Sequence, residues 1–223
     1  REHPENSELA ARISNYEMAA KMQTSVTDVL NLNSESAETK KLYGLDHTNG
    51  ATANYAKRCL MARRLVEQGV RFVQIYLSGQ PWDTHDKNAE KLKDLCLMTD
   101  QPSAALVKDL KQRGLLDSTI VLWCGEFGRL PISQGKDGRD HNRHAFTLWI
   151  AGGGFKRGYT HGGTDDFGYK AVHDVVRVYD LHATLLHALG LDHQKLTYPH
   201  EGRADSLTDT VVSGAKVIPE LLA

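Results

Sequence analysis

The sequence predicts an α/β fold in which a mostly parallel central sheet is covered by helices on both faces. Three continuous apolar runs, residues 70–77, 119–124 and 145–151, are typical of strands that are buried on both sides. Helical periodicity separates these runs along the chain. The helix expected over residues 51–68 leads into the first run through Gly69 alone, which is the connection of a layered α/β fold.

Helices are expected where apolar residues recur every three or four positions and where capping residues mark the ends. The pattern predicts helices over residues 7–23, 34–43, 51–68, 88–98, 100–114 and 175–189, with a further short helix from Ser25. Residues 1–50 are short on apolar surface, so they are interpreted as a helical cover or linker. Residues 51–223 are expected to form the core of a single domain that spans residues 1–223.

Composition excludes several classes of protein. The formal net charge of -1 predicts no strong attraction to nucleic acid. No apolar run reaches the ~20 residues that a membrane-spanning helix needs. The odd number and wide spacing of Cys59, Cys96 and Cys124 suit buried thiols better than a disulfide framework or a cysteine-based zinc site. The chain opens on Arg1 without an initiator methionine or a signal peptide, and we expect a fragment whose N-terminal part is missing.

The first candidate site residues are Asp83 and His85, which follow the run at 70–77. In an extended loop, residues two apart point to the same side. A carboxylate and an imidazole on one side make half of a zinc-type site. The alternative is that both are ordinary turn residues at a strand end.

Glu126 follows the most apolar run of the chain, between Gly125 and Phe127. A carboxylate at the end of a buried strand is either desolvated or held by a cation or a metal ion. Arg129 is the nearest cation in the sequence, so a structural Glu126–Arg129 ion pair is the alternative to a metal ligand.

A third polar group is formed by Arg139, Asp140 and His141, with His144 close behind. Asp140 could orient an imidazole through its second nitrogen, as carboxylates do for metal-bound histidines. Arg139 could clamp a phosphate or sulfate with two parallel hydrogen bonds. A charged, solvated loop is the alternative, and His144 competes with His141 as a ligand.

Two glycine-rich loops complete the survey. Residues 152–154 could offer backbone N–H groups to an anion, but the segment lacks the lysine and hydroxyl of a nucleotide-binding loop. Residues 164–166 could line the mouth of the site, and the alternative is an ordinary loop rich in Asp and Gly. The sequence has no Gly-x-Ser-x-Gly segment and no cysteine in a polar loop, so neither serine-hydrolase nor thiol chemistry is predicted.

Taken in order, the motifs resemble domain-of-unknown-function family 1501 (DUF1501), which is similar to sulfatases and belongs to the alkaline-phosphatase-like superfamily. The resemblance covers nearly the whole chain. The segments that carry it are residues 82–85 (WDTH), 109–114 (DLKQRG), 125–129 (GEFGR), 138–141 (GRDH), 152–154 (GGG), 163–165 (GTD) and 180–184 (DLHAT).

The resemblance implies a metal-dependent hydrolase of phosphate or sulfate esters, acting on a small molecule or a polysaccharide. It places Asp83, His85 and His141 as ligands of one divalent metal ion and Glu126 as a ligand of a second, the metal being zinc, calcium or magnesium. Arg129 and Arg139 would act on the substrate as catalytic residues. Members of the family are often exported bacterial proteins, so an exported or periplasmic location is expected.

Two departures from the superfamily pattern lead to a second hypothesis. Glu126 and Phe127 stand where the superfamily has an Asp–His pair, and the nucleophile is expected in a strand that precedes Arg1. These residues alone are therefore expected to be inactive. The alternative function is a non-catalytic exported binding or assembly protein that retains the fold.

Overall fold

The computed structural model describes residues 7–223, apart from the side chains of residues 7 and 21–28. These residues form two compact units, which are treated separately below. The first unit comprises the described residues up to Gln80 together with Asp94–Leu106. The second comprises Pro81–Lys93 and Val107–Ala223 and contains all of the candidate site residues.

The first unit is helical. Helix α1 (Ser7–Leu30) and helix α2 (Ala37–Tyr43) both contact α3 (Gly50–Glu67), whose apolar face supplies the buried Tyr55, Cys59 and Leu60. Short polar residues cap α2 and α3: the side chain of Ser36 accepts a hydrogen bond from Thr39, and that of Asn49 from Ala51. A 3₁₀ turn (η1, Leu32–Ser34) joins α1 and α2.

The predicted helices are largely confirmed, with two changes at their ends. The helix expected over residues 51–68 is α3. The separate helices expected before and after Ser25 form the single helix α1. The helices expected over residues 88–98 and 100–114 are one helix, α4 (Asn88–Gln112), with Pro102 in its interior. A proline inside a helix removes one backbone hydrogen bond. The buried side chains of Ala105, Leu106 and Leu110 stabilise the part of the helix that follows Pro102.

The predicted central sheet is wrong. The described residues contain four separate two-stranded sheets, all antiparallel, and no parallel pairing. The paired strands are β1 (Val121–Trp123) with β4 (Trp149–Ala151), β2 (Gly128–Arg129) with β3 (His141–Asn142), β5 (Gly163–Thr164) with β6 (Ala171–His173), and β7 (Thr197–His200) with β8 (Arg203–Ser206).

The three apolar runs that predicted the sheet differ in whether they form strands. Only Val121–Trp123 and Trp149–Ala151 of the later two runs pair, and they do so antiparallel, with Leu122 opposite Ile150. Residues 70–77 have no strand assignment, although half-buried and exposed side chains alternate along them. No residue of the three runs is fully buried, so the expected burial on both faces is wrong as well. Strand direction depends on partners far away in the sequence, which is why the parallel arrangement could not be inferred.

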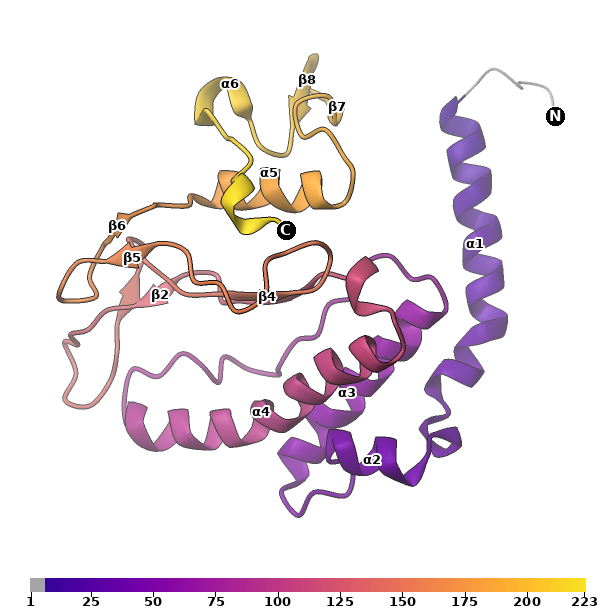
Figure 1. Cartoon of the computed structure of the whole chain (residues 1–223), viewed down its shortest axis with the longest axis horizontal. Helices are drawn as coiled ribbons and strands as arrows, with labels where there is room; N and C mark the ends of the chain where they lie inside the picture. The colour runs from indigo at the N-terminus through magenta and orange to yellow at the C-terminus, as the bar shows by residue number, and fades with distance from the viewer. Residues whose placement is uncertain (1–6) are drawn as a thin grey trace. The chain divides into compact units, whose positions relative to one another are not determined.

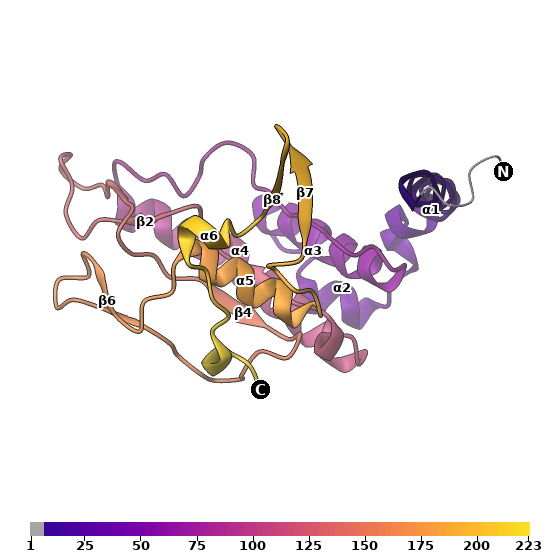
Figure 2. The same ribbon diagram turned by 90° about the horizontal axis from the view of Figure 1, so that it is seen from above.

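The second unit ends in a segment that is fastened to helix α5 (Val178–Ala188). The buried Asp180 accepts hydrogen bonds from the side chain of Arg177 (2.9 Å) and from the backbone N–H of Lys216 (3.0 Å). The hydroxyl of Thr184 accepts one from Ile218 (3.0 Å). The chain between α5 and Lys216 contains the β7–β8 hairpin and helix α6 (Thr210–Ser213) (Figure 1, Figure 2).

Two further predictions can be checked on this fold. Cys59, Cys96 and Cys124 are free thiols; Cys59 is buried as predicted, whereas Cys96 and Cys124 are exposed, so the prediction of buried thiols is wrong for these two. Among the helices of residues 7–223, none combines the length and the apolar character that crossing a membrane requires.

Candidate metal centre

The loop before α4 is shaped by its own hydrogen bonds. The backbone N–H groups of Thr84 and His85 donate to the carbonyls of Trp82 (3.0 Å) and Asp83 (3.1 Å), which keeps the turn tight. The buried hydroxyl of Thr84 donates to the side chain of Asn88 (2.5 Å) at the start of α4. Asp83 and His85 are therefore presented on a fixed loop.

The second loop of the site is the excursion between β2 and β3. Strand pairing sets Arg129 opposite His141. Two backbone hydrogen bonds join this excursion to the first loop, from Arg139 N–H to Thr84 (2.9 Å) and from Asn88 N–H to Asp137 (2.8 Å).

Gly138 is where the two loops come closest. A Cβ atom on this buried residue would lie 1.9 Å from the carbonyl oxygen of His85. No side chain fits at that distance, so glycine is required for the approach. The sequence contained this glycine in the GRDH segment, but nothing in the sequence indicated which backbone it faces.

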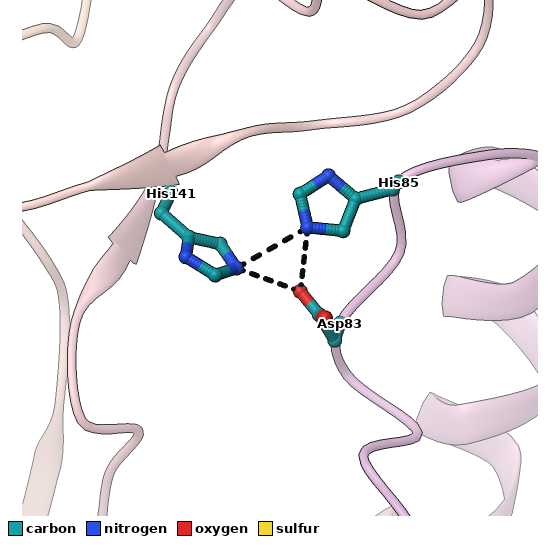
Figure 3. A group of neighbouring side chains, drawn as sticks. All are labelled: Asp83, His85 and His141. Carbon is teal, nitrogen blue, oxygen red and sulfur yellow. Dashed lines mark hydrogen bonds and ion pairs between the residues drawn. The ribbon is translucent and has the colours of Figure 1, made fainter.

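The two loops bring three ligand-type atoms together (Figure 3). The Nε2 atoms of His85 and His141 lie 3.0 Å and 2.9 Å from the same oxygen, Oδ1 of Asp83. The two Nε2 atoms are 3.2 Å apart. The side chains are partly open to solvent, with exposed fractions of 27% for Asp83, 49% for His85 and 50% for His141.

Asp83 also receives a hydrogen bond from Arg129, whose guanidinium lies 2.6 Å from Oδ1. The hydrogen bonds from His141 and then Arg129 lower the pKa of the Asp83 carboxyl to about 2. The carboxylate is thus held in the ionised form that metal coordination requires. The alternative ion pair, Arg129 with Glu126, is replaced in the structure by Arg129 with Asp83.

Asp140 orients His85. Its Oδ1 atom lies 3.2 Å from Nδ1 of His85, and its Oδ2 atom accepts a hydrogen bond from the backbone N–H of Gln134 (2.8 Å). The sequence indicated that Asp140 could orient an imidazole. The partner lies on the other loop, 55 residues away, and is not the neighbouring His141.

Aromatic side chains flank the centre. The ring of Phe127 lies 4.3 Å from that of His141, and the guanidinium of Arg129 lies 5.7 Å from the Phe127 ring. Trp82 packs edge-on against Trp123 at 5.6 Å. The sequence interpretation treated Phe127 as a departure from the Asp–His pair of the superfamily and did not predict its contact with His141.

The remaining predicted residues are not among the three residues whose ligand atoms converge. Glu126 is exposed and is not among the residues whose ligand atoms converge. The guanidinium of Arg139 donates to the carbonyl of Gly138 (2.7 Å). His144 stacks against Tyr169 at 5.8 Å, so His141 is the histidine that faces Asp83.

The donor set fits a metal ion. The ligand atoms of Asp83, His85 and His141 all lie within 4.8 Å of one another, and this group could hold an ion. Both ring nitrogens of His85 face carboxylate oxygens, one on Asp83 and one on Asp140. A cation at Nε2 and a proton at Nδ1 would satisfy both, which is the arrangement of a metal-bound histidine.

Site and fold together define a two-loop candidate metal centre on a scaffold of helices and short antiparallel hairpins. The family described as "Protein of unknown function (DUF1501)" matches residues 1–222, and the chain belongs to that family. No curated protein and no solved structure matches the chain.

Proposed function

We propose that this protein binds one divalent metal ion, preferably zinc, through Asp83, His85 and His141, and uses it in the hydrolysis of phosphate or sulfate esters. The observation that carries the proposal is the convergence of two Nε2 atoms on Oδ1 of Asp83, at 2.9 and 3.0 Å. Imidazole nitrogen with one carboxylate suits zinc, whereas calcium and magnesium prefer oxygen ligands.

Three protein ligands are the number found in catalytic zinc sites, which keep a further position open. The partial exposure of all three side chains agrees with access from solvent. An ion bound there would act as a Lewis acid that polarises an oxygen of the phosphate or sulfate group.

The surrounding residues have separate tasks in this proposal. Asp140 holds His85 in the orientation that points Nε2 at the ion, and Phe127 restrains the ring of His141. The guanidinium of Arg129, beside Asp83, is placed to attract an anionic ester and to stabilise negative charge on its oxygens. Arg139 belongs to the proposal as a second anion-binding residue.

Metal binding is tested by titrating the protein with zinc in a calorimeter, before and after treatment with a chelator. We expect one equivalent to bind, and His141→Ala to weaken binding more than about a hundredfold, since even the loss of a residue behind a ligand costs 10–100-fold. His182→Ala, an exposed histidine on α5, is the matched control and should bind normally. Equal affinity in the two variants would refute the centre.

Hydrolysis is tested separately with 4-nitrophenyl phosphate and 4-nitrophenyl sulfate. Turnover that is lost on chelation would support the proposed hydrolase. Turnover that survives both chelation and His141→Ala would contradict a role for the metal ion.

A second function is favoured by Glu126 and Phe127. Glu126 stands outside the group of ligands, and Phe127 places a ring without a ligand atom beside His141. These features favour a non-catalytic, exported metal-binding or assembly protein. Zinc binding that depends on His141, without turnover of either ester, would select this function.

A further inference from the structure

An open groove lies in the same unit as the candidate metal centre. Pro131, Ile132, Phe167 and Tyr169 line it together with Asp165 and Lys170, and its volume is about 550 Å³. Sites for small molecules have volumes of roughly 300–1,000 Å³ and combine apolar walls with a few polar groups. The groove has the size and the lining of a small-molecule site.

Both walls of the groove are joined, through the chain or through one hydrogen bond, to residues next to those of the metal centre. Pro131 follows Arg129 by two residues, and the intervening Leu130 donates its N–H to the carbonyl of Asp140 (2.8 Å). On the other wall, the carbonyl of Tyr169 accepts a hydrogen bond from the side chain of the buried Asn142 (3.0 Å), the residue after His141. A ligand anchored at the metal centre could therefore extend into the groove.

The groove exposes large apolar side chains on a loop that is held in shape. Phe167 is 82% exposed and Ile132 63% exposed. The carboxylate of Asp165 accepts hydrogen bonds from the N–H groups of Tyr169 (2.8 Å), Lys170 (3.1 Å) and Phe167 (3.2 Å). A preorganised loop loses little conformational entropy on binding, so covering its apolar side chains favours a ligand.

We propose that this groove binds a flat apolar ring, such as an aryl group, of an ester whose phosphate or sulfate lies at the metal centre. The inference rests on the proposed function and adds its substrate class. The walls supply apolar area for the faces of the ring, and the exposed Lys170 supplies a positive charge that complements the anionic ester. The loop predicted to line the mouth of the site, residues 164–166, contributes Asp165 to it.

Phenylphosphonate and methylphosphonate, which are not hydrolysed, test this proposal on the zinc-loaded protein by calorimetry. Both carry the same anionic group, so the difference between them reports the ring. We expect phenylphosphonate to bind about tenfold more tightly, as the burial of several apolar carbons predicts. Phe167→Ala and Ile132→Ala should each reduce this preference to about threefold or less, without changing methylphosphonate binding. Val211→Ala, 99% exposed on α6, is the control.

The outcomes separate this proposal from the metal centre itself. If zinc and methylphosphonate bind but the phenyl ring adds no affinity, or if Phe167→Ala and Ile132→Ala leave the preference intact, the groove proposal is wrong and the metal centre stands. If the protein binds no zinc, the proposed function fails and the groove proposal fails with it. Both variants expose less apolar surface than the wild type, so each is expected to fold.

Discussion

Two aspartates of the second unit, Asp83 and Asp180, each bind an arginine, and they differ in their exposure and in their other partners. The Asp180 side chain is 1% exposed and is saturated by Arg177 and the backbone of Lys216. The Asp83 side chain is 27% exposed and is faced by two histidine nitrogens as well as Arg129. The same ion pair is thus structural where every acceptor is occupied by the fold, and a candidate site where ligand atoms converge next to solvent.

Asp83→Asn is expected to have the largest effect and tests the difference between the two aspartates most directly. Replacing one carboxylate oxygen by an amide removes a charged ligand, so zinc affinity should fall more than about a hundredfold, beyond the cost of losing an orienting residue. Competition with a fluorescent zinc chelator measures the change. Asp180→Asn is the matched control, with unchanged zinc affinity expected, and similar losses in both variants would erase the distinction.

Gly138→Ala tests whether the two loops must touch. The added methyl group would lie 1.9 Å from the carbonyl of His85, so the loops must separate. Such overpacking costs about 1–3 kcal/mol of unfolding free energy, and it should weaken zinc binding as well. Denaturant unfolding and zinc titration of the same variant check both effects. Gly50→Ala is the control, because its added methyl group meets nothing within 4 Å and its backbone does not have a positive φ.

Asp180→Asn is expected to lower the free energy of unfolding by about 2 kcal/mol, because hydrogen bonds to a buried charged group are lost. The amide also turns a donor toward Arg177 and Lys216, which are donors themselves. Urea denaturation at neutral pH measures the loss. A change within about 0.5 kcal/mol, typical of surface substitutions, would show that the two aspartates do not differ in role.

Acid should remove the contribution of the Asp180 carboxylate to the free energy of unfolding. Burial alone would raise the pKa of its carboxyl, but hydrogen bonds from Arg177 and the N–H of Lys216 outweigh it, so the pKa lies below its ordinary value. A lowered pKa in the folded state stabilises the protein above the unfolded-state pKa of about 3.9 and ceases to do so as the pH falls through the folded-state pKa. The stability difference from Asp180→Asn should therefore shrink below about pH 4, as unfolding curves at several pH values would show.

The smallest effect is expected for Asp140→Asn. Asp140 touches His85 and not the ion, so its loss should weaken zinc binding about tenfold. Zinc titration checks this, with Asp137→Asn on the same loop as the control. Equal zinc affinity of Asp140→Asn and the wild type would show that His85 needs no orienting carboxylate.

Local patterns carried the sequence interpretation as far as they could. The periodicity of residues 51–68 and the capping residues predicted α3, because both signals lie within a few positions of one another. The spacing of Asp83 and His85 predicted a shared side, and the two residues do face the same point. The role of each residue in binding or catalysis stays a prediction.

Long-range features escaped the sequence for a physical reason. The apolar run at residues 70–77 indicated a strand, but nothing local states whether a partner exists. Glu126 was grouped with the metal ligands because a buried strand was expected to end at it, and β1 ends at Trp123. The hydrogen bond between Asp140 and His85 spans 55 residues and has no sequence signature.

The two loops that meet at Gly138 have a mechanical consequence. Nε2 of His85 and Nε2 of His141 are separated by 56 residues of chain and by 3.2 Å in space. An ion bound to both atoms would cross-link the two loops and close a long loop of the chain. Bringing the ends of that loop together costs conformational entropy each time the protein refolds, and metal binding would offset part of this cost. The side chains that would handle an ester would then also govern how fast and how cooperatively this part of the chain assembles.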